Sequence, residues 1–266
     1  MSAGARSEVS AGGAAEPPSG ATDWERRVVG RSLDDARRRS IDRGARLIRA
    51  AATVLERTNG ESLTVQDVAD EAGQSLRTLY QYFSSKDDLL LAVFEEAMRT
   101  YATLIRGAIA ELTDPVERLS GAVIAAARMP ALHRRSGVDR GLSHLRLQLT
   151  QAEPELVARS QEPVTAVYRE LVAAALASAD PPVVDVEVGT YLLSALRQSV
   201  ILSLTWGNEY GTDLPDAIDL SCFSLAGLGL ARPRRWHEAV DARLELSGAD
   251  GRSILRRLAK AGPVRG

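Results

Sequence analysis

Apolar residues recur at helical spacing through most of the chain, and no convincing run of alternating apolar and polar positions indicates a β-strand. The first helix is predicted from Ser32 or Ser40 to Arg57, before a glycine stop signal. Its apolar positions are spaced by three or four residues: Ala45, Ile48, Ala52 and Leu55. The valine-rich segment 183–188 is ambiguous, but the apolar pattern continues from it to Trp206. We therefore interpret it as the start of a helix.

Two short helices and the start of a longer one follow, each with a polar residue placed to cap it. The segment Thr64-Val-Gln-Asp67 fits a weak capping box, in which a hydroxyl and a carboxylate satisfy the free N–H groups of a helix start. Gly73 suits the positive φ of a sharp helix exit, and Ser75 can cap the next helix. Ser85-Lys-Asp-Asp88 repeats the capping pattern. The two short helices therefore have the spacing of a helix-turn-helix.

The rest of the chain is predicted to form longer helices separated by prolines or glycine. We expect them over Lys86–Arg106, Pro115–Met129, Val138–Gln151, Pro163–Ala177, Val184–Asn208 and Leu214–Ala231. The predicted fold class is therefore all-α. The predicted domains are a disordered tail over residues 1–30, a helix-turn-helix domain over 31–90, a larger helical domain over 91–231 and a basic extension over 232–266.

The composition narrows the class of protein without identifying it. Cys222 is the one cysteine, so no intramolecular disulfide can form and we expect a cytoplasmic location. The N-terminal residues lack the apolar core of a signal peptide. The longest uncharged apolar run, near residues 220–231, is too short to span a membrane, so no membrane partner is expected. A net charge of −2 says nothing about nucleic acid, because local basic patches remain possible.

The helix-turn-helix carries a dense motif. It reads Thr64-Val-x-x-Val-Ala-x-x-Ala-Gly73, followed by Ser75-x-x-Thr-Leu-Tyr-x-Tyr-Phe-x-x-Lys-Asp-x-Leu89. This motif closely resembles the DNA-binding signature of the TetR family of transcriptional regulators, over about residues 40–95. Gln74 departs from the pattern, because the family usually has a small aliphatic residue there. The resemblance implies double-stranded DNA as a partner and a helical ligand-binding and dimerisation domain after the motif.

The residue types of the motif suit contacts with a duplex. Thr64 and Lys86 lie at helix starts, where N–H groups and a cation favour phosphate. Arg77 is the best candidate to read a base, because a guanidinium pairs bidentately with guanine. We expect Tyr82 to point away from the apolar Leu79/Phe83 stripe and reach a phosphate, with Tyr80 on the edge of that stripe. The candidate DNA-binding residues are Thr64, Ser75, Leu76, Arg77, Thr78, Tyr80, Gln81, Tyr82 and Lys86.

Two further features concern the arginine-rich first helix and the larger domain. The arginines between residues 37 and 46 form either a solvated helix face or an additional phosphate contact. The segment 184–208 is apolar on nearly all sides, and Ala226-Gly-Leu-Gly229 could approach another helix closely. Both suit a two-fold dimer interface of four helices, which the family resemblance implies. Two recognition helices would then read a pseudo-palindromic operator.

A ligand site is implied by the resemblance, and polar or aromatic side chains interrupt the apolar helices where it would lie. The candidates are Met129, His133, His144, Tyr168, Tyr191, Arg197 and Trp206. Arg146 and Gln198 also interrupt the apolar helices. For each of them, a satisfied core or interface role is the plainer interpretation. Arg197 stands out because it needs a carboxylate, either from the protein or from an acidic ligand.

The leading hypothesis is a homodimeric repressor that a small, mostly apolar molecule releases from its operator. A regulator that needs its ligand to bind DNA, or one that activates, is an alternative. A small-molecule enzyme using His133 or His144 as a base is a hypothesis of another class, but no nucleophile–base pair accompanies either histidine. A helix-turn-helix used for protein contact is a third class. No cofactor is expected, and no residues have metal-ligand spacing.

Overall fold

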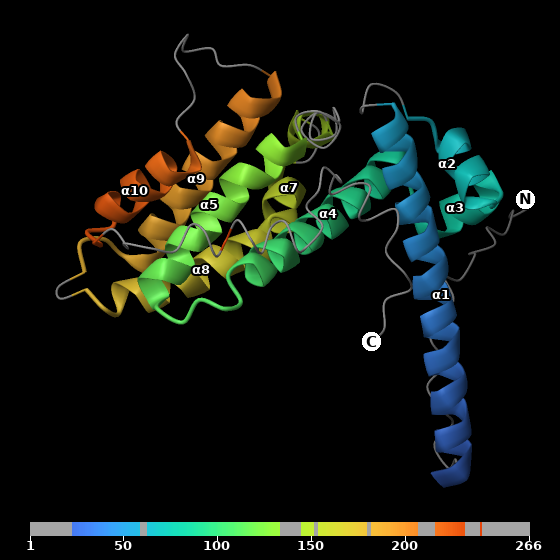
Figure 1. Cartoon of the computed structure of the whole chain (residues 1–266). Helices are drawn as coiled ribbons and strands as arrows, with labels where there is room; N and C mark the ends of the chain where they lie inside the picture. Colours follow the sequence, from blue (N-terminus) through green and yellow to red (C-terminus); the bar gives the residue numbers. More distant parts are fainter. Residues whose placement is uncertain are drawn as a thin grey trace, which may run out of the picture. The chain divides into compact units, whose positions relative to one another are not determined.

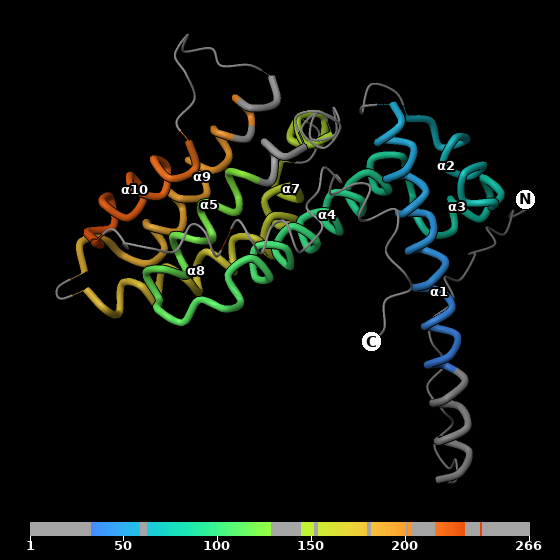
Figure 2. The backbone as a smooth tube through the Cα atoms, in the orientation of Figure 1, coloured from blue at the N-terminus to red at the C-terminus, as the bar shows by residue number. Residues whose placement is uncertain are grey.

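The computed structural model describes residues 23–58, 63–133, 145–151, 154–179, 182–206, 216–231 and 240 (Figure 2). Every regular element in these ranges is an α-helix, which confirms the all-α prediction (Figure 1). The helices are α1 (Asp23–Arg57), α2 (Val65–Ala72), α3 (Leu76–Tyr82), α4 (Lys86–Ala108), α5 (Pro115–His133), α7 (Pro154–Ser160), α8 (Glu162–Leu176), α9 (Val186–Trp206) and α10 (Ala217–Gly227). Residues 145–151 are also helical. None of the helices in the described ranges is long and apolar enough to cross a membrane.

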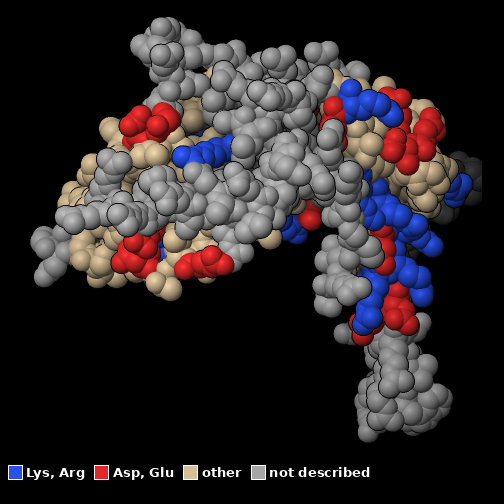
Figure 3. Space-filling view, in the orientation of Figure 1, with Lys and Arg blue, Asp and Glu red and all other residues tan. Residues whose placement is uncertain are grey.

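The chain divides into two compact units, residues 1–43 and residues 44–266, and α1 extends across their boundary. Because α1 begins at Asp23, residues 23–30 are helical, and their assignment to a disordered tail was wrong. An acidic residue at the helix start and an absence of proline after it favour this extension. In the first unit, residues 33–43 are exposed, and Figure 3 shows basic and acidic side chains interspersed along α1.

The predicted caps of the short helices are confirmed. Thr64 accepts a hydrogen bond from the Asp67 N–H while the Asp67 carboxylate accepts from the Thr64 N–H, which is a complete capping box. Gly73 ends α2 with φ 61°, and Ser75 caps α3. Ser85 caps α4, but the reciprocal bond differs from the expected box. The Asp88 carboxylate accepts from the N–H and the hydroxyl of Ser84, one residue earlier than predicted.

The short helices α2 and α3 are held by a shared core. Each contributes at least one fully buried side chain, Val68 from α2 and Leu79 from α3, to the cluster that also contains Leu47 of α1 and Leu89 of α4. Phe83, directly after α3, is 8% exposed and belongs to the same cluster. A seven-residue helix cannot be stable alone, so this burial fixes the position of α3.

The helices from α4 to α10 form the larger helical region. Helix α4 contacts α5, α7 and α8, while α5 contacts α8, α9 and α10. Gly121 in α5 and Gly189 in α9 allow close packing, since a Cβ at either position would meet a neighbouring side chain at 2.9 Å. Gly229 has φ 70° and its missing Cβ would collide with Val183, so it packs against a chain segment rather than against the helix we expected.

Two boundaries in this region differ from the prediction because of proline. Helix α5 continues through Pro130 to His133 instead of ending at Met129. Proline lacks the N–H that would bond the carbonyl four residues earlier, and the Tyr101 hydroxyl of α4 donates to that carbonyl, at Ala126, at 2.9 Å. Pro154 opens the unpredicted helix α7, because proline is tolerated in the first turn of a helix. Of the predicted helix Val138–Gln151, residues 138–144 lie outside the described residues.

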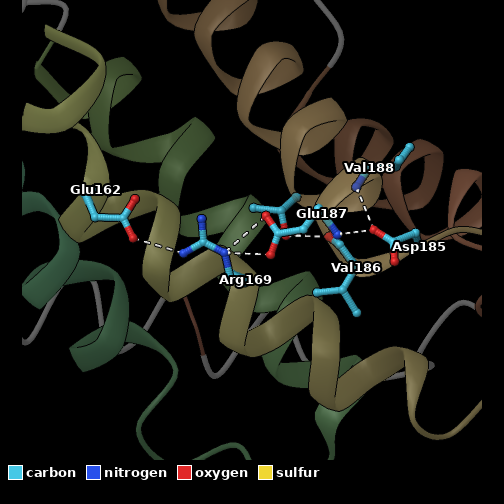
Figure 4. Close-up of polar contacts among 7 residues, drawn as sticks. Glu162, Arg169, Asp185, Val186, Glu187 and Val188 are labelled. Carbon is cyan, nitrogen blue, oxygen red and sulfur yellow. Dashed lines mark hydrogen bonds and ion pairs between the residues drawn. The ribbon is translucent and has the colours of Figure 1, made fainter. Parts of the chain in front are cut away.

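Arg169 of α8 forms one ion pair within its own helix and a second one that joins α8 to the start of α9 (Figure 4). The Arg169 guanidinium donates to Glu162 at 3.0 Å and to Glu187 at 2.9 Å, and these carboxylates raise its pKa. Asp185 caps α9 by accepting from the N–H groups of Glu187 and Val188. A second exposed ion pair, between Arg106 and Glu170, joins α4 to α8. These contacts pair both Arg106 and Arg169 with carboxylates of the helical region.

Candidate nucleic-acid interface and ligand cavity

The outer side of α3 carries side chains that can contact DNA. Arg77 and Gln81 are exposed, and Tyr80 is 51% exposed. Leu76 and Thr78 are half-buried, and Leu79 on the opposite side is fully buried. The helix therefore presents a guanidinium, an amide and a phenol outward while its apolar side holds it in place. These are the groups that bind base edges and phosphates.

The two tyrosines exchange the places that the sequence pattern predicted for them. Tyr82 is half-buried and packs against the core, and its ring lies next to Gly44 of α1, where an added Cβ would be 3.8 Å from the Tyr82 Cδ1. Tyr80 is the more exposed of the two. The expectation that Tyr82 points away from the buried stripe was wrong, because α1 supplies a second buried surface that a single helix pattern does not include.

The helix starts on either side of α3 are also exposed. Thr64 lies in front of α2, and its hydroxyl and N–H both donate to the Asp67 carboxylate. The hydrogen bonds from Thr64 lower the pKa of that carboxyl. The hydroxyls of Ser75 and Thr78 are 2.9 Å apart and share a hydrogen bond. Lys86 is exposed in the first turn of α4. Thr64 and Ser75 thus already have partners, whereas Arg77 and Lys86 have no ion pair among the described residues.

A narrow, mostly apolar cavity of about 20 Å³, partly open to solvent, lies between α5, α8, α9 and α10. Its apolar lining is Val123, Ala127, Leu193, Leu196, Val200 and Leu220. Tyr168, Arg197 and Ser224 are its polar lining residues. Burial raises the pKa of Tyr168 to about 12, although the positive charge of Arg197 opposes this rise. The walls of the cavity are therefore mostly apolar and carry a small number of polar groups, as the walls of ligand sites do.

The cavity brings together two of the seven predicted ligand residues, Tyr168 and Arg197. Tyr191 is 71% exposed and does not line the cavity. The side chains of Met129, His133 and Trp206, and the whole of His144, lie outside the described residues. Sequence reasoning missed two residues of this region, Ser224 on the cavity wall and Tyr101 beneath the Arg197 guanidinium. Neither has a signal in its local sequence, because only the packing of distant helices places them.

The side chains around Arg197 leave polar atoms without partners. The Nε atoms of Arg146 and Arg197 and the hydroxyl of Ser194 are buried with no hydrogen bond among the described residues. Arg197 reaches the neutral oxygen of Gln161 at 3.4 Å, and its guanidinium lies 5.8 Å from the centre of the Tyr101 ring. Burial, and then the charge of Arg197, lower the pKa of Arg146 to about 10. In the described ranges, no three acidic, histidine or cysteine residues gather as metal ligands.

Helix α3 presents polar side chains outward, and it shares a buried apolar core with the capped helix α2. This arrangement defines a helix-turn-helix protein. Residues 47–93 match the model of the family described as bacterial regulatory proteins, tetR family. Residues 47–93 thus carry the DNA-binding region of the TetR family, which confirms the resemblance found in the sequence for this part of the chain.

Related sequences match about a third of the chain. The HTH-type transcriptional regulator HbdR of Aromatoleum sp. (strain CIB) is 37% identical over 82 residues, covering 31% of this chain and 36% of the relative. The HTH-type transcriptional activator FasR of Mycolicibacterium smegmatis is 34% identical over 99 residues, covering 37% of this chain and 45% of the relative. These matches thus span less than half the length of the curated relatives.

Solved structures match more of the chain, at lower identity. RolR in complex with resorcinol superposes with a TM-score of 0.53 and 18% identity, covering 77% of this chain and 94% of that one. A putative transcriptional regulator from Pseudomonas aeruginosa PAO1 gives a TM-score of 0.52 and 19% identity, covering 77% of this chain and 92% of that one. At such identities the likeness establishes the fold of the helical region. It gives no information about a ligand, which has to be inferred from the residues of this chain.

Proposed function

We propose that the protein is a homodimeric repressor that binds a pseudo-palindromic operator through α3 and leaves it when a small molecule binds the helical region. The observation that carries this proposal is the outer side of α3, where Arg77, Tyr80 and Gln81 are exposed while Leu79 is fully buried. Arg77 is the base reader, because its guanidinium can pair with guanine in the major groove. Lys86 and Tyr80 contact the phosphates on either side.

Exposed apolar side chains on α9 and α10 support the dimer. Tyr191 and Phe223 are each 71% exposed, and Val188 and Leu192 are about half exposed. Large apolar groups exposed on both helices are costly to leave in water, and their burial against a second copy would remove that cost. A two-fold dimer also supplies the second recognition helix that a palindromic operator requires.

The cavity supports the release by a ligand. It lies in the helical region, and its Arg197 guanidinium stacks over Tyr101 of α4, the helix that begins directly after the helix-turn-helix. A ligand that prefers one position of α4 shifts the population toward one spacing of the two recognition helices. When that spacing differs from one turn of the duplex, the affinity for the operator falls.

The DNA-binding proposal can be tested with Arg77→Ala. Binding sites are first selected from random duplexes with the purified full chain, and the affinity of the best site is then measured by gel shift at several salt concentrations. Arg77→Ala should weaken binding roughly tenfold to a hundredfold, because one bidentate base contact is lost. Arg159→Ala, an exposed arginine on α7, removes the same charge and should bind as the unchanged protein does. Equal affinities for all three proteins would refute the role of α3.

An activator is the second candidate, and the match to the HTH-type transcriptional activator FasR favours it. The two candidates share the same DNA-binding helix and differ in the direction of control. A reporter placed behind the selected site distinguishes them, since removal of a repressor raises the signal and removal of an activator lowers it.

A further inference from the structure

Two half-buried arginines of the helical region have no acidic partner among the described residues. The Nε atoms of Arg146 and Arg197 are both buried without a hydrogen bond, and no carboxylate among the described residues pairs with either side chain. The two residues lie close enough that the charge of Arg197 lowers the pKa of Arg146. Two like charges held together in a poorly solvated place are unfavourable, so this arrangement costs the protein stability.

Another arginine of the same helical region does have acidic partners. Arg169, on the exposed side of α8, contacts the carboxylates of both Glu162 and Glu187 (Figure 4). A charge that water solvates poorly needs a carboxylate more than an exposed charge does, and these arginines show the opposite distribution of partners. The more exposed Arg169 has two carboxylates, and the half-buried Arg146 and Arg197 have none among the described residues.

The contacts that Arg197 does make leave its charge uncompensated. Gln161 supplies one neutral oxygen at 3.4 Å, and the face of the Tyr101 ring supplies a weak cation–π contact. Arg197 also lines the cavity, where most of its neighbours are apolar. A guanidinium placed at an apolar cavity is suited to bind a planar carboxylate, since two parallel N–H···O bonds fit its geometry.

Resting on the regulator function proposed above, we propose that the effector is an apolar organic acid, whose carboxylate binds Arg197 with Arg146 and whose apolar body inserts between the apolar side chains of the narrow cavity and widens it. The carboxylate neutralises the repulsion between the two guanidinium groups and satisfies their buried N–H groups. The apolar lining from α5, α9 and α10 then selects the body of the acid by shape. Binding thus removes a cost that the ligand-free protein carries, which makes the acid group a specificity determinant.

A matched panel of ligands tests this proposal. The panel contains straight-chain carboxylates from hexanoate to dodecanoate, benzoate and phenylacetate, each paired with the alcohol of the same skeleton. The melting temperature of the full chain is measured with every compound. At least one acid should raise it, while the corresponding alcohol should not. The proposal is overturned when no acid raises the melting temperature, or when acid and alcohol raise it equally.

Three variants locate the binding of that acid. Arg197→Met and Arg146→Met should each weaken its affinity roughly tenfold to a hundredfold, as expected for the loss of charge-assisted hydrogen bonds. Arg169→Met is the matched control, because it removes an arginine of the same region that has its own carboxylates. It should bind the acid with unchanged affinity. Equal affinities of Arg197→Met, Arg146→Met and the unchanged protein would place the acid elsewhere.

The stability of Arg197→Met without any acid gives an independent result. A half-buried charge with no carboxylate partner among the described residues is replaced by an apolar side chain of similar length, so the melting temperature should stay the same or rise. A fall larger than that of Arg169→Met would mean that Arg197 has a carboxylate partner inside the protein. That result would also overturn the proposal, because the arginine would then need no external acid.

These experiments separate the effector proposal from the DNA-binding proposal. Arg197→Met should retain its affinity for the selected operator, and Arg77→Ala should retain its affinity for the acid. An unchanged protein that binds the selected operator but none of the acids in the panel rejects the effector class alone. An Arg77→Ala protein that binds both operator and acid normally rejects the role of α3 and leaves the acid site in place.

Discussion

At the helix starts of the helix-turn-helix, polar side chains find partners within four residues: Thr64 with Asp67, Ser75 with Thr78, and Ser84 with Asp88. Around the cavity of the helical region, the buried polar atoms of Arg146, Ser194 and Arg197 find none among the described residues. The two regions belong to the same unit of the chain, so the difference is not one between a well-packed part and a loose part.

The difference shows which side chains of each region remain free to bind a partner. In the helix-turn-helix, the capping groups are used locally, and the side chains left outward on α3 and the start of α4 are available for a large external surface. Around the cavity, the groups left over point to a small partner in the interior, because a buried guanidinium cannot be satisfied by a surface. One region is thus complete as a scaffold, and the other lacks a counter-charge among the described residues.

The largest expected effect is a loss of stability, and it tests whether buried side chains hold the helix-turn-helix together. Leu79 is fully buried and is the one fully buried side chain of α3. Leu79→Ala should lower the free energy of unfolding by about 2–5 kcal/mol, because it removes buried methyl groups and leaves a cavity. Gln81→Ala, on the exposed side of the same helix, should change it by less than about 0.5 kcal/mol. Denaturant unfolding of both variants measures the contrast, and similar losses would contradict it.

Much of the helix-turn-helix could be predicted because its signals are local. The Thr64–Asp67 capping box, the Gly73 exit and the Leu79 core position each depend on residues no more than four apart. The exchanged places of Tyr80 and Tyr82 show where this stops. A seven-residue helix has little surface that is free of neighbours, and the packing of Tyr82 beside Gly44 of α1 depends on residues far apart in the sequence.

The second expected effect tests whether the helical region does satisfy buried groups when the fold requires it. Tyr101 is 3% exposed, and its hydroxyl donates to the Ala126 carbonyl that Pro130 leaves without a helical bond. Tyr101→Phe should lower the free energy of unfolding by about 1–3 kcal/mol, because a buried carbonyl loses its donor. An unchanged stability would mean that the interior tolerates unpaired polar groups generally, and the arginines would lose their significance.

The cavity region could be predicted only in part, and Tyr101 shows why. A proline at position 130 reads as the end of a helix, and the residue that compensates for it lies 25 positions away from the carbonyl on another helix. Arg197 was recognisable as an arginine within an apolar helix, because that pattern is local. Its neighbour Arg146 and the cavity itself depend on how four helices pack, and no spacing in the sequence encodes that arrangement.

The smallest expected effect concerns the capping box, where it tests how much the local pairing of polar groups contributes to stability. Thr64→Ala removes the hydroxyl that caps α2 and should lower the free energy of unfolding by about 1 kcal/mol, while Thr64→Ser keeps the cap and should change it less. The cap also predicts a pH dependence. The Asp67 carboxyl has a lowered pKa in the folded state, so the unfolded chain binds its proton at a higher pH.

That contribution to stability is therefore complete above the unfolded pKa of about 4 and is lost as the pH falls through the folded pKa. Thr64→Ala raises the folded pKa of Asp67 toward its ordinary value, and the variant should lose less stability than the unchanged protein between neutral pH and about pH 3. Thermal unfolding across this range measures the difference. Parallel curves for both proteins would show that the carboxylate does not depend on Thr64, and the local pairing that distinguishes this region would then be weaker than its hydrogen bonds suggest.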